Sequence, residues 1–145
     1  MATAVSETAS RTGSPDGDPL GSLTRGLRAE LALLEELRAQ LVEQRSALAA
    51  DDTATLEQVV QQIGRTLLTI GEARKQRTFL VEMVTGVPGA GLLDVAESLP
   101  EASAAPLRAL CRELHAAAVA TNRDLAINQT AIRRAIETGE RFLHR

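Results

Sequence analysis

Residues 20–48, LGSLTRGLRAELALLEELRAQLVEQRSAL, place a leucine at every seventh position. Further leucines stand between these positions, so an apolar face recurs with the period of an α-helix over four heptads. The heptad leucines are Leu20, Leu27, Leu34, Leu41 and Leu48, and those between them include Leu23, Leu31 and Leu37. This stretch predicts a long amphipathic helix of the coiled-coil type.

A second helix is expected after a short turn at residues 49–53, where Asp52 or Thr53 can cap its first free N–H groups. Apolar residues then recur in alternating steps of four and three, as one helix face requires. They are Leu56, Val60, Ile63, Leu67 and Ile70, followed by Val81 and Val84. Three glycines and a proline at residues 86–91 end this helix.

The rest of the chain predicts one short and one long helix. Residues 92–99 form a short apolar segment of one or two helical turns, and a third long helix is expected from about Pro106. The predicted fold class is therefore all-α: an antiparallel, coiled-coil-like hairpin with a long third C-terminal helix, resembling a three-helix bundle. Residues 1–19 have almost nothing to bury and are expected to be a disordered tail, leaving 20–145 as a single helical domain.

The composition argues against several classes of protein. Sixteen basic and nineteen acidic residues give a net charge of −3, and aromatic residues make up only 1% of the chain. A nucleic-acid-binding protein usually carries a basic excess and stacking aromatics, so we expect no nucleic-acid partner. No apolar stretch is long enough for a signal peptide or a membrane span, and the one cysteine favours a reducing, cytoplasmic setting.

No constellation of residues predicts catalysis, a metal site or a cofactor. Cys111 and His115 stand four residues apart, but zinc needs three or four such ligands and His144 is the only other histidine. We expect Cys111 to be an inert core residue. The glycine-rich segment at 86–91 lacks the strand and the Lys-Ser/Thr of a phosphate-binding loop, so it is interpreted as a linker.

Several polar and small residues interrupt the helix seams. If the hairpin turns near residue 52, facing positions sum to about 104, which sets Arg74 of the second seam against Glu30 of the first. We expect these two to form a partly buried ion pair that fixes register more than it adds stability. Gly64 and Gly71 either admit a close helix partner or are simply tolerated; the second interpretation is favoured.

The third long helix carries the candidate binding surface. At 100° per residue, Leu107, Leu125 and Leu143 fall on one line, with Ile132 and Ile136 close to it. Asn122 and Asn128 flank the line and either cap a packed seam or align an incoming helix. The arginines lie on the opposite side and are expected to keep it in solvent: Arg108, Arg112, Arg123, Arg134, Arg141 and Arg145.

The order of these features resembles the FlgN family. The features are the leucine-seamed helix running into Glu43–Leu48, the Asp51-Asp52 turn, the Arg74/Arg77 pair, the glycine-rich break and the final NRDLAINQTAI at residues 122–132. The likeness covers residues 20–145. It implies a non-catalytic cytoplasmic chaperone that binds the C-terminal helical segment of hook-associated proteins and delivers them to the flagellar export apparatus.

In that family the client-binding part is C-terminal. The residues expected to bind the client here are Asn122, Leu125, Asn128, Ile132, Ile136 and Leu143. Two rival interpretations remain: another small helical secretion chaperone, such as the filament-cap class, or a structural coiled-coil adaptor that self-associates permanently. For a chaperone we expect at most weak homo-oligomerisation.

Overall fold

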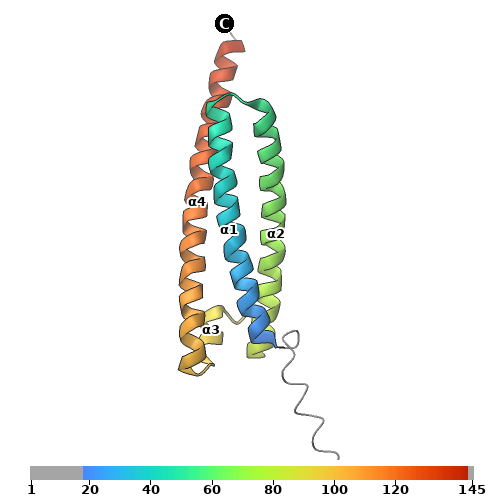
Figure 1. The fold of residues 1–145 in the computed structure, drawn as a ribbon, viewed down its shortest axis with the longest axis vertical. Coiled ribbons are helices and arrows are strands. Elements are labelled where there is room, and N and C mark those ends of the chain that lie inside the picture. The colour runs from blue at the N-terminus through green and yellow to red at the C-terminus, as the bar shows by residue number, and fades with distance from the viewer. Residues whose placement is uncertain (1–17, 144–145) are drawn as a thin grey trace, which may run out of the picture.

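A computed structural model describes residues 18–143 of the chain. It contains three long helices, α1 (Pro19–Ala49), α2 (Thr53–Thr85) and α4 (Glu101–Leu143), and one short helix, α3 (Leu92–Glu97) (Figure 1). No strand occurs among the described residues. The all-α class, the antiparallel hairpin of α1 and α2, and the long C-terminal helix are therefore confirmed. The short α3 lies in the segment 92–99, where the sequence predicts one or two turns.

Aspartates cap both helices of the hairpin. The side chain of Asp18 accepts a hydrogen bond from the Leu20 N–H at 3.1 Å, and Pro19 is the first helical residue, one position before the predicted start. At the hairpin turn Asp51 adopts a positive φ of 55°, and Asp52 accepts from the Thr55 N–H at 3.2 Å. The expected tail at 1–19 falls mostly on residues 1–17, which lie outside the described residues.

The predicted start of the third long helix at Pro106 is wrong by five residues. α4 begins at Glu101, and the Pro100 carbonyl accepts hydrogen bonds from the Ser103 and Ala104 N–H groups at 2.9 Å. A proline inside a helix loses the bond to the carbonyl four residues earlier, here that of Ala102. Because residues 102–105 favour the helix strongly and only one bond is lost, the helix runs through Pro106.

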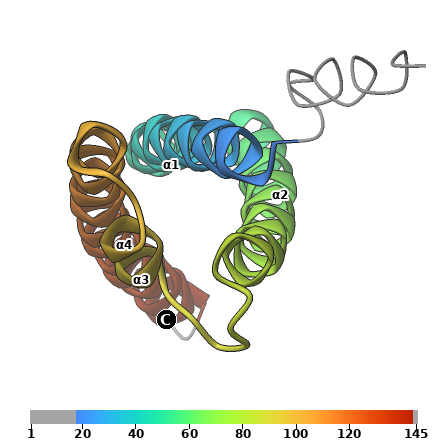
Figure 2. The ribbon, with the colours of Figure 1, turned by 90° about the horizontal axis from the view of Figure 1, so that it is seen from below.

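α1 is the central helix of the bundle. It packs against α2 on one side and α4 on the other, whereas no α2 Cα atom lies within 8 Å of an α4 Cα atom in residues 18–143. Seen end-on, the three long helices form three sides of an open triangle, with α3 at one end (Figure 2). The two outer helices are therefore held together mainly through α1.

The buried face of α1 follows the heptad leucines and the positions three residues after them. The second set comprises Leu23, Glu30, Leu37 and Gln44, all buried. Leu31, which the sequence places in the seam, is only half-buried. In this second set, apolar and polar side chains alternate from one heptad to the next, so that Glu30 and Gln44 are two buried polar positions on α1.

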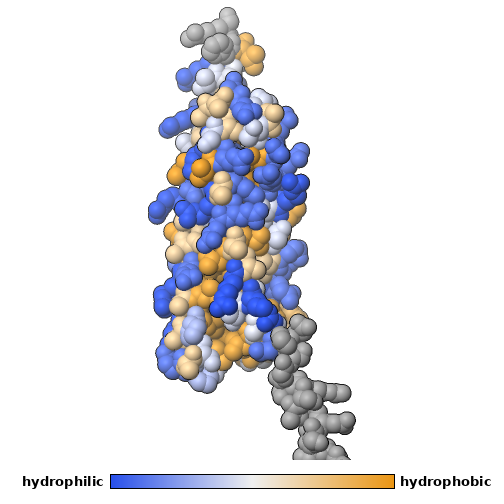
Figure 3. Space-filling view, in the orientation of Figure 1, coloured by the Kyte–Doolittle hydropathy of each residue, from blue (hydrophilic) through white to orange (hydrophobic). Residues whose placement is uncertain are grey.

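The outer side of α1 is covered mostly by hydrophilic side chains. In the face shown in Figure 3, smaller apolar patches are interspersed among them.

Candidate functional site

The first polar layer joins α1 to α2 around Glu30. Its side chain is 2% exposed, and Arg77 Nη1 donates a hydrogen bond to Glu30 Oε1 at 2.8 Å. Arg74 Nε lies 3.8 Å from the same oxygen, and its side chain is 56% exposed. Arg74 is thus within ion-pair reach, as the hairpin register predicts, but Arg77 is the closer and more buried partner.

Glu30 is held in an electrostatically unusual environment. Burial raises the pKa of Glu30 above 4.5, although Arg77 and Arg74 act in the opposite direction. Only one of the two carboxylate oxygens is engaged: Glu30 Oε2 is buried and has no hydrogen-bond partner among the described residues. The layer therefore contains two arginines around one carboxylate and an acceptor that is left unused.

The second polar layer joins α1 to α4 around Asn128. Asn128 Nδ2 donates to the Leu41 carbonyl at 2.8 Å and to Gln44 Oε1 at 2.7 Å. Its Oδ1 accepts a hydrogen bond from Arg45 Nη1 at 2.7 Å. One turn away, Arg38 Nε pairs with Asp124 Oδ2 at 2.9 Å. Asn128 is 3% exposed, so its amide is fully committed to α1.

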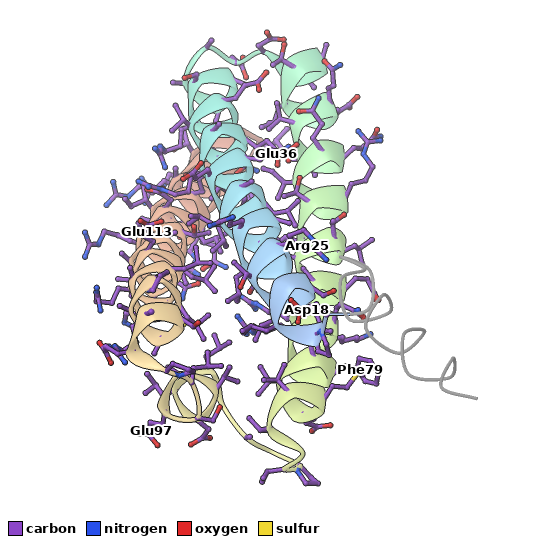
Figure 4. The ribbon with its side chains drawn as sticks, turned by 60° about the horizontal axis from the view of Figure 1, so that its bottom comes forward. Asp18, Arg25, Glu36, Phe79, Glu97 and Glu113 are labelled. Atoms are coloured by element: carbon purple, nitrogen blue, oxygen red, sulfur yellow. The ribbon has the colours of Figure 1, made fainter. Side chains whose placement is uncertain are left out.

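A groove runs between α2 and α4 with α1 as its floor. Its volume is about 1210 Å³. The floor is formed by Glu30 and Leu34, and the start of α3 and the loop before it close one end. Figure 4 shows α3, marked by Glu97, at this end of the bundle, while Phe79 points outward from α2.

Apolar walls and basic edges characterise this groove. Val81 lines it from α2, and Leu114 and Ala118 from α4, while the basic side chains are Arg74, Arg77, Arg108 and Arg112. The sequence places Arg108 and Arg112 on a face turned to solvent. Both line the open groove, where Arg112 is exposed and Arg108 half-buried. Asp124 and Asn128, on one flank of the leucine line, contact α1, and these arginines on the other flank border the groove.

Cys111 and His115 also line the groove. The thiol is half-buried, and burial raises its pKa, with Arg77 and Arg112 acting against this shift. The described residues hold no group of three or more His, Cys, Asp and Glu side chains that could bind a metal ion. Nothing in this arrangement activates the thiol as a nucleophile, which requires a lowered pKa.

The six residues predicted to bind a client lie in different environments along α4. Asn128 is buried, Leu125 and Ile132 are half-buried, and Asn122 is exposed. Ile136 is 56% and Leu143 85% exposed. The C-terminal end of α4 projects beyond the turn between α1 and α2 (Figure 1), which explains why the last two remain uncovered.

Gly64 and Gly71 face open space. A Cβ atom added at either position meets no atom within 4 Å. No other described helix approaches them closely, which agrees with the interpretation that both glycines are tolerated rather than required for packing.

Sequence reasoning missed Gln44, Arg77 and the groove edges. Gln44 stands two heptads after Glu30, so the heptad pattern itself could have indicated a second polar layer. Arg77 is one helical turn from Arg74, and the choice between them depends on the crossing of α1 and α2. The groove has no local sequence signal, because it is defined by the absence of a helix between α2 and α4.

Comparison with known proteins adds to this picture. A family model described as FlgN protein matches residues 20–144, which include all four helices except the first residue of α1. No curated protein and no solved structure matches the chain. No described helix is long and apolar enough to cross a membrane. On the extent of the family match, the chain belongs to the FlgN family of flagellar export chaperones.

Proposed function

We propose that the protein acts in the cytoplasm as a chaperone for hook-associated proteins. It binds their C-terminal helical segment, keeps that segment soluble and delivers it to the flagellar export gate. Family membership supports the general role, and the surface of α4 supports the kind of client. An apolar helix face is recognised by another amphipathic helix. Because the client segment becomes ordered on binding, the entropic cost lowers the affinity and the complex can dissociate.

One observation carries this proposal: the apolar line of α4 continues where no other helix covers it. α4 has 43 residues and α1 has 31, which correspond to about 64 Å and about 46 Å of helix. Ile136 and Leu143 are consequently exposed in the free protein. Uncovered apolar side chains aligned on one face mark a partner surface more often than a solvated one.

The six predicted residues divide into two roles. Ile132, Ile136 and Leu143 form the client-binding strip, here called the distal strip, and Asn122 and Leu125 border it on the bundle side. Asn128 contributes by fixing α4 on α1 through its hydrogen bonds, so that the strip projects in a constant direction.

The proposal is tested by placing a carboxylate in the distal strip. Ile136→Asp should weaken binding of a peptide spanning the C-terminal helical segment of a hook-associated protein by about tenfold or more, because the charge would be desolvated without a partner. Binding is measured by titration calorimetry, and helix content by circular dichroism. Ile132→Asp should act in the same direction, although this half-buried position also contributes to packing.

Ile127→Asp is the matched control. Ile127 is 47% exposed but lies on the opposite side of α4, so the same substitution there should leave the peptide affinity unchanged within about twofold. Equal losses of affinity for Ile127→Asp and Ile136→Asp, or full binding by both variants, would contradict the proposed surface.

The rival interpretations are separated by two further measurements. A permanent coiled-coil adaptor would sediment as a stable homo-oligomer at micromolar concentration, whereas the proposed chaperone sediments mainly as a monomer. A chaperone of the filament-cap class would bind the C-terminal segment of the filament-cap protein in preference to that of the hook-associated proteins.

A further inference from the structure

The position between α2 and α4 is filled at one end only. α3 packs against both α4 and α2, and its Val95 and Ala96 are buried. Beyond α3 the same position is empty, and the groove described above occupies it. Helices in four-helix bundles surround a shared core, so α1, α2 and α4 occupy three of four such positions along this stretch. The groove has the place of an absent fourth helix (Figure 2).

The charges along the groove are unbalanced. Four arginines line it, against the two carboxylates of Glu30 and Asp94, and Arg108 pairs with Glu101 beside the groove. Glu30 already forms ion pairs with both Arg74 and Arg77, and Asp94 accepts a hydrogen bond from the Gly91 N–H at 2.8 Å. Arg112 makes no ion pair with any described residue. An occupant with acidic edges would complement this surface.

Glu30 supplies an independent sign of an occupant. Its side chain is 2% exposed and lines the groove, and its Oε2 atom has no hydrogen-bond partner among the described residues. A buried carboxylate oxygen without a donor is costly, and natural proteins rarely leave one unpaired. A donor side chain on the occupant, such as an amide or a hydroxyl, would satisfy it.

We propose that the groove binds an amphipathic helix of the client as the fourth helix of the bundle. Its apolar face covers the accessible lining residues Leu92, Leu93 and Ala118, above the buried floor of the groove. Its acidic edges face Arg112 and the Arg74/Arg77 pair, and one donor side chain reaches Glu30. The open wall from Arg108 to Ala118 is about 15 Å long, room for three helical turns. That the occupant belongs to the client rests on the proposed function; the helical and acidic chemistry rests on the groove.

Cys111 reports directly on occupancy. It is the only cysteine of the chain, it is half-buried and it lines the groove. The experiment measures, by mass spectrometry, the rate at which iodoacetamide alkylates the full-length protein with and without saturating hook-associated C-terminal peptide. A bound helix should slow alkylation about fivefold or more, because it excludes the reagent from the groove. Binding of the peptide at an unchanged alkylation rate would overturn the inference.

The acidic chemistry is tested by reversing one charge. Arg112→Glu should weaken peptide binding about fivefold, and more at low than at high ionic strength. Arg123→Glu is the matched control, because Arg123 lies on nearly the same side of α4, three turns further on and outside the groove. Equal affinities of the Arg112→Glu and Arg123→Glu variants would reject acidic edges on the client.

Failure of the groove and failure of the proposed function give different results. If Ile136→Asp abolishes peptide binding while bound peptide leaves the wild-type Cys111 rate unchanged, the distal strip stands and the groove does not. If Ile136→Asp leaves both binding and Cys111 protection intact, the groove stands and the distal strip does not. Absence of any binding to the wild-type protein rejects the client assignment and, with it, this occupant.

Discussion

The two polar layers of α1 occupy equivalent heptad positions but differ in how they are satisfied. Around Asn128, the side-chain amide donates to Gln44 Oε1 and to the Leu41 carbonyl and accepts from Arg45, so every polar atom of the Asn128 side chain has a partner. Around Glu30, a buried carboxylate meets two arginines through one oxygen and leaves the other unpaired. The Asn128 side chain is therefore fully hydrogen-bonded, whereas the Glu30 layer keeps one buried acceptor oxygen without a donor among the described residues.

This difference coincides with what covers each layer. The amide layer lies where α4 packs against α1, and the Glu30 layer lies at the floor of the open groove. A satisfied buried network fixes the register of two helices, while a partly satisfied one carries a penalty that a bound group can relieve. The Asn128 layer thus aligns α4 on α1, and the Glu30 layer is the one that we propose to contact a partner.

The largest expected effect comes from breaking the amide layer. Asn128→Ala removes the hydrogen-bonding partner of Gln44 and Arg45 and should lower the free energy of unfolding by about 3 kcal/mol. Asn122→Ala, at an exposed position of the same helix, should change it by less than about 0.5 kcal/mol. Urea denaturation followed by circular dichroism measures both; similar values for the two variants would show that the layer is not structural.

The Glu30 layer should respond unequally to loss of its two arginines. Arg77→Ala leaves a buried carboxylate with only a distant cation and should cost about 2 kcal/mol. Arg74→Ala removes an exposed partner at 3.8 Å and should cost less than about 1 kcal/mol. Double-mutant cycles with Glu30→Leu should give the larger coupling energy for Arg77, and a larger one for Arg74 would contradict the observed geometry.

The Glu30 layer should also make stability depend on pH. Because the pKa of Glu30 is raised on folding, the folded state binds more protons than the unfolded state between pH 4.5 and that raised pKa. Its contribution to stability is present at low pH and is lost as the pH rises through this window. Relative to Glu30→Gln, the wild-type protein should gain stability on acidification from neutral pH. A relative loss would mean that the arginines outweigh burial.

The smallest effects concern the helix that carries the arginines. Gly71→Ala, near the Glu30 layer, and Gly64→Ala, further from it, should each raise the free energy of unfolding by up to about 1 kcal/mol, since alanine favours the helix and neither Cβ meets a neighbour. Gly86→Ala is the opposite control, because its φ of 69° strains an L-residue and should lower stability. Thermal denaturation midpoints distinguish the three variants.

The sequence predicts where the helices lie along the chain better than it predicts which side chains they pack against. The leucine period and the capping aspartates lead directly to the hairpin, since they depend on local geometry and on burial of one face. The sequence predicts the start of α4 five residues too late, because a proline is more often first in a helix than sixth. Local preference for helix over residues 102–105 outweighed the one hydrogen bond that Pro106 removes.

The tertiary structure decides which polar residues form hydrogen bonds or ion pairs between helices, and with which partners. From the sequence alone, Asn122 and Asn128 are equivalent flanks of one leucine line, yet only Asn128 is turned into α1. Likewise, Arg74 and Arg77 are neighbours on one helix, and the crossing of α1 and α2 brings Arg77 closer to Glu30. A helical period fixes which side chains share a face, but rotation and crossing of packed helices decide what that face meets. The open groove follows from the same cause, because an unfilled position in a bundle is a property of three helices together and of no single stretch of the chain.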